Sequence, residues 1–158
     1  MRIIKELSIA KPVEEVWEVL GNQFGEIDNW ASLISHSEVS GQAKLPGVNY
    51  SIRSTKTAQG DTQQELTGFH PDKHEISYKS ISGSPAIIKQ VSAHWSLKKG
   101  GENNTQLMLD FTAEMKGLGF ILAPIAKIKL GKVGDVLLDD FKYYVENGKP
   151  HPRKMSAS

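Results

Sequence analysis

The chain has 158 residues and no cysteine, and its 19 basic and 18 acidic side chains leave a formal net charge of +1. The length fits a single domain with one core or one cavity. The lack of cysteine excludes disulfides, thiolate nucleophiles and cysteine-ligated metals. The net charge near zero does not indicate a surface that binds nucleic acid or an anionic membrane. It does not exclude a local patch of charged residues.

The first thirty residues predict one strand followed by two short helices. Apolar residues at alternate positions between 3 and 9 are typical of a strand with one buried face. Pro12 fits the first turn of a helix that Gly21 ends. Residues 24 to 30 predict a second short helix. Trp30, at its end, would lie near the mouth of a cavity, where its side chain forms either part of the pocket wall or part of the packing at the rim. The apolar stripe of the first helix, with Trp17 expected in the core, comprises Val13, Val16, Trp17 and Leu20.

The middle of the chain predicts six strands separated by turns. Clusters such as Leu45-Pro46-Gly47 and Gly83-Ser84-Pro85 separate segments in which apolar and polar residues alternate. Short connections of this kind join neighbouring antiparallel strands, so an antiparallel meander is the economical interpretation. The expected strands cover residues 36–40, 48–57, 62–69, 74–82, 87–99 and 104–116.

A long helix is predicted from about residue 118 to 146. Apolar residues there follow three- and four-residue steps, and the acidic residues, Asp140 among them, fall mostly on other faces. Pro124 should start or kink this helix, and Gly148 ends it. We therefore expect one domain over residues 1–148, followed by a disordered tail over 149–158.

The order of elements predicts an α+β helix-grip fold: a curled antiparallel sheet of about seven strands around the long C-terminal helix, with two short helices after the first strand. The helix must bury its stripe, and the concave face of the sheet is the only large surface available. The segment KPVEEVWEVLGNQFGEIDNW at 11–30 resembles the APxEEVWxxLxDFxxxxxW opening of the START-like (SRPBCC) superfamily, in particular its polyketide cyclase/dehydrase-like branch. QQEL at 63–66 and HEISYKSISGSP at 74–85 are similar to the ErL…D…r…Y…g…P run of that family.

The histidines and serines do not predict a metal site or a catalytic triad. His70 and His74 have the spacing of a helical metal pair, but Pro71-Asp72-Lys73 between them makes a turn. There is no G-x-S-x-G elbow, and nothing orients a serine toward His94. We therefore expect no metal and no cofactor, and we assign no catalytic residue.

Three polar residues are candidates for orienting a ligand. The resemblance implies that Glu65 and Tyr78 point into the cavity, although Glu65 could equally face solvent with Leu66 inward. In strand 87–99 the neighbours His94 and Trp95 point to opposite faces. Hydrophobic burial favours Trp95 on the inner face, whereas relatives with hydrated pockets often have polar side chains on that face. We favour His94 in the pocket, and a one-residue bulge would reverse this choice.

The leading hypothesis is a binding module that encloses an apolar or aromatic small molecule, lipid-like or polyketide-like, between sheet and helix. One alternative is an aromatase/cyclase-like or dehydratase-like enzyme that transfers protons through the three polar candidates. Another is an interaction module of the chaperone-activator type, with a filled core; an empty cavity above about 300 Å³ would argue against it. The expected ligand-binding residues are Trp30, Tyr50, Ile52, Glu65, Tyr78, His94, Phe111, Leu122, Val133, Leu137 and Phe141.

The remaining expectations concern partners and location. No apolar stretch approaches the roughly 18 residues of a membrane span, and the N-terminus has no apolar signal region. We expect a cytoplasmic monomer or homodimer with a hydrophobic small-molecule ligand, no nucleic-acid partner and no integral membrane segment.

Overall fold

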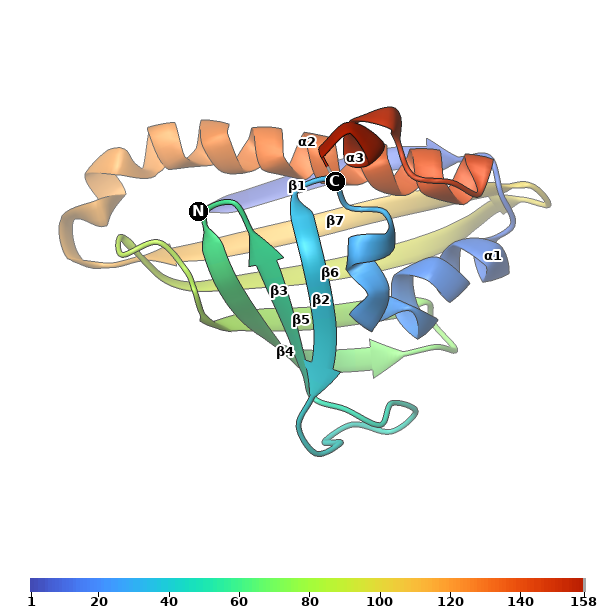
Figure 1. Ribbon diagram of the computed structural model, residues 1–158, viewed down its shortest axis with the longest axis horizontal. Coiled ribbons are helices and arrows are strands. Elements are labelled where there is room, and N and C mark those ends of the chain that lie inside the picture. The colour runs from blue at the N-terminus through green and yellow to red at the C-terminus, as the bar shows by residue number, and fades with distance from the viewer. Residues whose placement is uncertain (158) are drawn as a thin grey trace.

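The structure, a computed structural model that describes residues 1–157, is a seven-stranded antiparallel sheet that curls around one long helix (Figure 1). The strand order in the sheet is β1-β7-β6-β5-β4-β3-β2. The α+β helix-grip prediction is confirmed, with the short helical elements following β1. The strands are β1 (Arg2–Ile9), β2 (Ile34–Ser40), β3 (Ile52–Thr57), β4 (Gly60–His70), β5 (Glu75–Ser82), β6 (Ile88–Gly101) and β7 (Asn104–Met115). The helical elements are α1 (Val13–Trp17), η1 (Glu18–Asn22), η2 (Phe24–Asn29), η3 (Gly117–Leu122), α2 (Ala123–Asn147) and α3 (Pro152–Ala157).

Alternation along the central strands determines which side chains face α2. In β1, Ile3 lies opposite Phe111 of β7, and Leu7 lies opposite Leu107. Their polar neighbours, such as Glu6, point to the other face of the sheet, where side chains are exposed. Because side chains alternate between faces with period two, these pairs form one apolar inner face, which α2 covers.

The Trp17 ring lies directly against the helical backbone at position 21, because Gly21 has no side chain. A Cβ atom at Gly21 would lie 2.3 Å from Cζ2 of Trp17, which is far inside van der Waals contact. The Trp17 ring in turn packs on Phe69 of β4, with 5.6 Å between ring centroids. Trp17 is thus buried in the core, as expected. The helical backbone does not end at Gly21, however; it continues through that residue as the π-helical turn η1.

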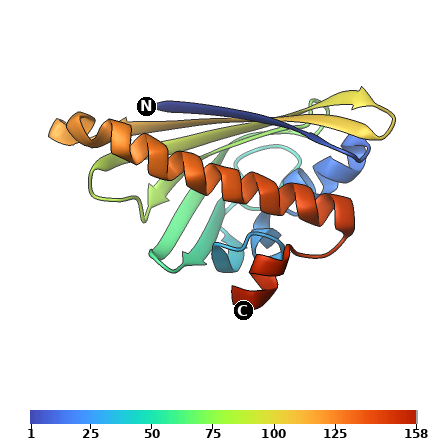
Figure 2. The ribbon, with the colours of Figure 1, turned by 90° about the horizontal axis from the view of Figure 1, so that it is seen from above.

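Helix α2 has two different halves. Its buried residues, Leu138, Asp140 and Phe141, all lie toward the C-terminus, whereas Ile125 and Ile128 near its start are more than half exposed. Pro124 occupies the first turn, where its missing N–H is not needed. Figure 2 shows the first turns of α2 at the same end of the molecule as the N-terminus. The C-terminal half therefore anchors the helix, and the N-terminal half is largely uncovered.

The segment after Gly148 is ordered by contacts with the rest of the chain. Residues 152–157 form α3, and Nε of Arg153 donates to Oδ1 of buried Asp140 at 2.6 Å. Nζ of Lys154 donates to the carbonyl oxygen of Ile34, also at 2.6 Å. This arrangement differs from the disordered tail expected over 149–158, because composition alone did not reveal a buried carboxylate that binds Arg153. Ser158 lies outside the described residues.

Candidate functional site

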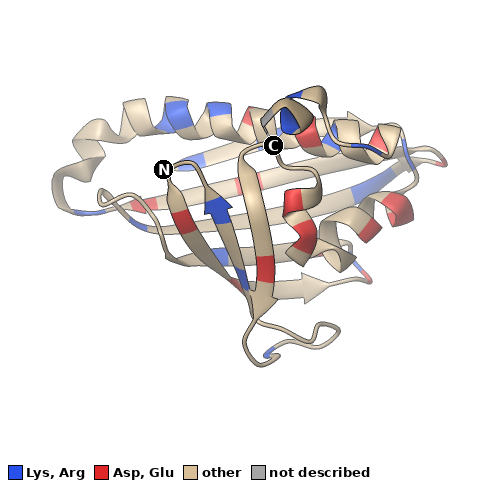
Figure 3. Ribbon diagram, in the orientation of Figure 1, with Lys and Arg blue, Asp and Glu red and all other residues tan. Residues whose placement is uncertain are grey.

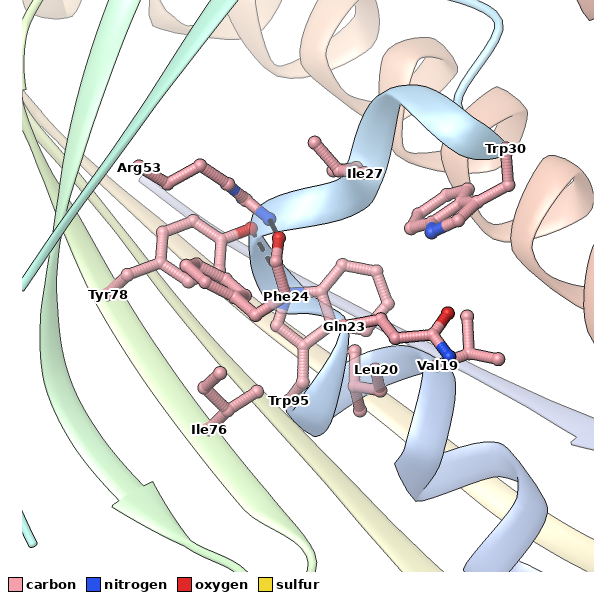
Figure 4. Close-up of a pocket in the computed structure, with 10 residues that line it drawn as sticks. All are labelled: Val19, Leu20, Gln23, Phe24, Ile27, Trp30, Arg53, Ile76, Tyr78 and Trp95. Atoms are coloured by element: carbon pink, nitrogen blue, oxygen red, sulfur yellow. Dashed lines mark hydrogen bonds between the residues drawn. The ribbon is translucent and has the colours of Figure 1, made fainter. Parts of the chain in front are cut away.

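The inner face of the sheet and the helical elements line two small, partly open voids. The first has a volume of about 10 Å³, which is enough for roughly one water molecule. It lies between η1, η2 and the central strands, as Figure 4 shows. Its walls are Val19, Leu20, Gln23, Phe24, Ile27, Trp30, Arg53, Ile76, Tyr78 and Trp95.

The second void has a volume of about 70 Å³ and lies between the sheet and the middle of α2. Its lining is apolar apart from Lys5, whose Nζ donates to Oδ1 of Asp135 at 2.5 Å, and the hydroxyl and indole groups of Tyr78 and Trp95. The walls are Ile3, Lys5, Tyr78, Trp95, Leu109, Phe111, Leu130, Val133, Gly134 and Leu137.

Tyr78 and Trp95 line both voids and separate them. The indole Nε1 of Trp95 donates a hydrogen bond to the Tyr78 hydroxyl at 3.2 Å. Tyr78 also packs on Phe24, with 5.4 Å between ring centroids. We call these two side chains the Tyr78–Trp95 partition; the void on its α2 side has a more apolar lining, and the void on its η2 side is lined by Gln23 and Arg53.

Arg53 is the most unusual group at this site, because its guanidinium is buried with only neutral hydrogen-bond acceptors. Nε and Nη2 donate to Oε1 of Gln64 at 2.8 and 2.5 Å, and Nη1 donates to the carbonyl oxygen of Phe24 at 2.9 Å. The Arg53 side chain lies over the Phe24 ring, with Cζ 3.7 Å from the ring centroid. Its Cζ is also 5.1 Å from the centroid of Tyr78. Aromatic faces of this kind stabilise a desolvated cation.

Burial lowers the pKa of Arg53, because loss of water disfavours the charged form. A buried charge normally has an oppositely charged partner, since an unpaired one costs several kcal/mol. Within residues 1–157, no carboxylate forms an ion pair with Arg53. The hydrogen bonds to Gln64 and Phe24 occupy three of the five N–H groups of the guanidinium, and the Tyr78 hydroxyl is a further neutral partner. The site thus contains a desolvated positive charge next to a void.

Sequence reasoning missed Arg53 because it assigned the opposite face of β3 to the interior. Arg53 and Thr55 are buried, whereas Ile52 lies on the outer face opposite Glu65. The apolar-inward rule fails here because Gln64, directly across from Arg53, and the Phe24 ring provide polar and aromatic partners. The sequence feature that could have indicated a buried Arg53 is Gln64, its cross-strand partner on β4. A search for alternating apolar residues does not detect such a polar pair.

Six of the expected site residues lie around the voids. Tyr78, Phe111, Val133 and Leu137 line the larger one, and Trp30 lines the smaller one. Phe141 lies directly behind them, fully buried. Its ring centroid is 5.1 Å from that of Trp30 and 6.1 Å from that of Trp95.

Two of the polar candidates face away from the voids. Glu65 is on the outer face, where Lys44 approaches to 2.8 Å and Lys79 to 3.5 Å. The hydrogen bond from Lys44 lowers the pKa of Glu65. His94 is also outside, with Nδ1 2.7 Å from Oγ of Ser77. Its expected place in the pocket is taken by Trp95, because the register through this part of β6 has no bulge and hydrophobic burial decides the face.

The three other expected residues lie apart from the voids. Tyr50 lines an open surface groove with Phe69 and Val48, and burial raises the pKa of its hydroxyl. Ile52 is on the outer face of β3. Leu122 ends η3 with 45% of its surface exposed.

The structure is thus a helix-grip fold with two small voids between sheet and helices and a buried guanidinium at the wall of one of them. The chain is a member of the family described as polyketide cyclase / dehydrase and lipid transport, whose sequence model matches residues 3–146.

Solved structures with the same fold are similar over nearly the whole chain. A START superfamily protein from Mycobacterium smegmatis has a TM-score of 0.77 at 16% identity, with 94% of this chain and 99% of that chain covered. The Zhui aromatase/cyclase from Streptomyces has a TM-score of 0.66 at 14% identity, with 96% and 99% covered. A protein from Thermus thermophilus has a TM-score of 0.72 at 15% identity, with 100% and 99% covered. No curated protein matches the chain. At these identities the likeness establishes the fold alone.

Proposed function

We propose that the protein binds an apolar small molecule with one acidic or strongly accepting head group, which pairs with Arg53. The observation that carries this proposal is the buried guanidinium with only neutral acceptors, next to a void. A ligand carboxylate or phenolate would supply the missing negative charge. Charge-assisted hydrogen bonds of this kind are roughly twice as strong as neutral ones.

The apolar part of the ligand would occupy the void under α2. Leu109 and Phe111 of β7 face Leu130, Val133 and Leu137 of the helix across this space. The void alone is too small for a ring system, since a cavity that holds benzene has about 150 Å³. Binding therefore requires the Tyr78–Trp95 partition to move, or the poorly covered first half of α2 to shift outward.

The lining of the voids favours binding over proton-transfer catalysis. Among the described residues that line them, none is a carboxylate or an imidazole. A cyclase or dehydratase acting by proton transfer needs a positioned acid or base with a matched pKa. Of the three polar candidates, Tyr78 alone lines a void, and it already accepts a hydrogen bond from Trp95. A filled-core interaction module remains the competing hypothesis, because both volumes are far below 300 Å³.

Binding of naphthoic acid and of naphthalenemethanol, which differ in the carboxylate, tests the proposal by titration calorimetry. We expect the wild type to prefer the acid. Arg53→Gln should lower affinity for the acid by about 10- to 100-fold, the scale of a hydrogen bond to a charged group, and should change affinity for the alcohol little. Leu137→Trp, which fills the void under α2, should weaken both probes.

Three outcomes would contradict the proposal. Equal losses of both probes in Arg53→Gln would assign Arg53 a structural role. Unchanged binding in Leu137→Trp would locate the probes outside the cavity. Failure of the wild type to bind either probe would favour the interaction module.

Substitutions on the outer face are expected to leave ligand binding intact. Glu65→Gln and His94→Ala should bind naphthoic acid within about twofold of the wild type, because both side chains lie across the sheet from the voids. Titration of the two variants beside Arg53→Gln checks this prediction. A tenfold loss in either one would mean that the ligand sits on the outer face.

A further inference from the structure

The end of the molecule where η3 passes into α2 has an unusual surface. Large apolar side chains there are exposed, and lysines lie among them. The exposed fractions are 73% for Leu118, 63% for Phe120, 63% for Ile121, 45% for Leu122, 56% for Ile125 and 62% for Ile128. We call these six residues, together with Lys116, Lys127, Lys129 and Lys132, the tip.

These apolar residues are not part of the face that α2 turns to the sheet. The inward face of the helix carries Leu130, Val133 and Leu137, which line the void. Ile125 and Ile128, three residues apart in α2, lie on a different face, and Ile121 precedes them in η3. The N-terminal half of α2 therefore has two apolar faces, of which one covers the cavity and the other meets solvent.

The exposed face lies in a segment, between Glu114 and Asp135, whose charged residues are all lysines. From residue 116 to 134 the chain contains four lysines and no aspartate or glutamate. Figure 3 shows this asymmetry on the ribbon, where lysines without acidic residues mark the first half of α2. The whole chain is nearly neutral, with 19 basic and 18 acidic side chains, so the tip is a local basic patch that bulk charge conceals.

We infer that the tip docks on an anionic lipid bilayer. Large apolar patches on a protein surface mark interaction sites, and helices with apolar and lysine-rich faces lie in the headgroup region of membranes. The lysines would meet lipid phosphates while Leu118, Phe120 and Ile121 enter the acyl boundary. A second copy of the chain is a poorer occupant, because a two-fold contact through the tip would bring eight lysines together without an acidic partner.

The docking geometry is that of a surface contact. Within residues 1–157, no helix is long and apolar enough to cross a membrane. Because Leu130 and Val133, which line the void under α2, are sequence neighbours of the tip residues Lys129 and Lys132, docking would bring this side of the cavity close to the bilayer. That consequence rests on the proposed ligand-binding function, whereas docking itself does not.

Co-sedimentation with vesicles tests the inference. The full chain should associate with vesicles of phosphatidylcholine mixed with phosphatidylglycerol, should associate far less with phosphatidylcholine alone, and should dissociate as salt is added. The triple variant Lys127→Gln/Lys129→Gln/Lys132→Gln should lose affinity by roughly 100- to 1,000-fold, at about one factor of five to ten for each lysine. Phe120→Ser/Ile125→Ser should lose at least about tenfold.

Matched controls lie elsewhere on the surface. Ile4→Ser/Val39→Ser removes two exposed apolar side chains outside the tip, and Lys56→Gln/Lys98→Gln/Lys99→Gln removes three exposed lysines outside it. Both should bind mixed vesicles like the wild type. Leu137→Trp should also dock normally, so that a failure of ligand binding and a failure of docking can be told apart.

The inference is overturned if the wild type ignores mixed vesicles, or if the control variants lose as much affinity as the tip variants. It is also overturned if light scattering shows a dimer that the tip variants dissociate while no form binds vesicles, since the tip would then contact a second copy. Circular dichroism of every variant excludes unfolding as the cause of a loss.

Discussion

Phe141→Ala is expected to lower the free energy of unfolding by about 3–5 kcal/mol, the usual cost of truncating a fully buried phenylalanine. Phe141 is the largest side chain in the structure with no exposed surface. Its ring packs edge-to-face against Trp30 and Trp95, so the substitution removes apolar burial and two aromatic contacts together. Urea unfolding followed by circular dichroism measures the change without relying on the tryptophans.

The matched control is Phe120→Ala, which truncates the same side chain where 63% of it is exposed. We expect its free energy of unfolding to stay within about 0.5 kcal/mol of the wild type. A loss below 1 kcal/mol in Phe141→Ala would mean that the site collapses around the missing ring. In that case Trp30 and Trp95 would not be held in place by Phe141, and the walls of the small void would be looser than the structure indicates.

The fold was predictable from the sequence because its signals are local and repeated. Strand and helix periodicities differ, and turn residues mark nearly every junction, so the order of elements followed directly. The least accurate strand boundary was that of β3, which begins at Ile52 and not at residue 48, and the long helix expected from about residue 118 begins as the 3-10 helix η3 before α2 starts at Ala123. Residues 48–51 alternate like a strand, but an alternating pattern does not reveal where a neighbouring strand ends.

The site was harder to predict because it depends on which face of a strand is inside. Trp95 and His94 are adjacent and point to opposite faces of β6. Placing one of them inside therefore places all side chains of its face inside and those of the other face outside. Burial energy selected the tryptophan, as the simple rule states. At Arg53 the same rule failed, because a guanidinium can lie inside when Gln64 and the Phe24 carbonyl accept its hydrogen bonds. That exception depends on residues 11 and 29 positions away in the sequence.

The two halves of α2 connect the site to the tip. Phe141 and Leu138 hold the C-terminal half in the core, while the N-terminal half covers the void with one face and leaves the other exposed. Few buried contacts imply a low free energy of local opening. The half of the helix whose outward shift would admit a ligand is therefore the half that we infer to contact the bilayer.

Asp140→Asn is expected to lower the free energy of unfolding by about 1.5–3 kcal/mol, because it removes the charge from a buried carboxylate that accepts hydrogen bonds from Ser32 and Arg153. The periodicity placed Asp140 off the apolar stripe, yet its side chain has no exposed surface. Oδ2 accepts hydrogen bonds from the backbone N–H of Ser32 at 2.8 Å and from its hydroxyl at 2.6 Å. Oδ1 accepts from Nε of Arg153 at 2.6 Å, so one carboxylate joins α2 to the η2–β2 connection and to α3.

Asp139→Asn is the matched control for that carboxylate, since Asp139 contacts the same Arg153 but its side chain is 59% exposed. An exposed ion pair contributes at most about 1 kcal/mol, so Asp139→Asn should change the free energy of unfolding by less than that. Arg153→Met removes the cationic partner of the same pair. It should lower the free energy of unfolding strongly, because the Asp140 charge is then buried without a cation. Urea unfolding of the three variants gives the comparison. Equal small losses in all three would show that α3 does not hold Asp140, and the C-terminal half of α2 would then be anchored by Phe141 and Leu138 alone.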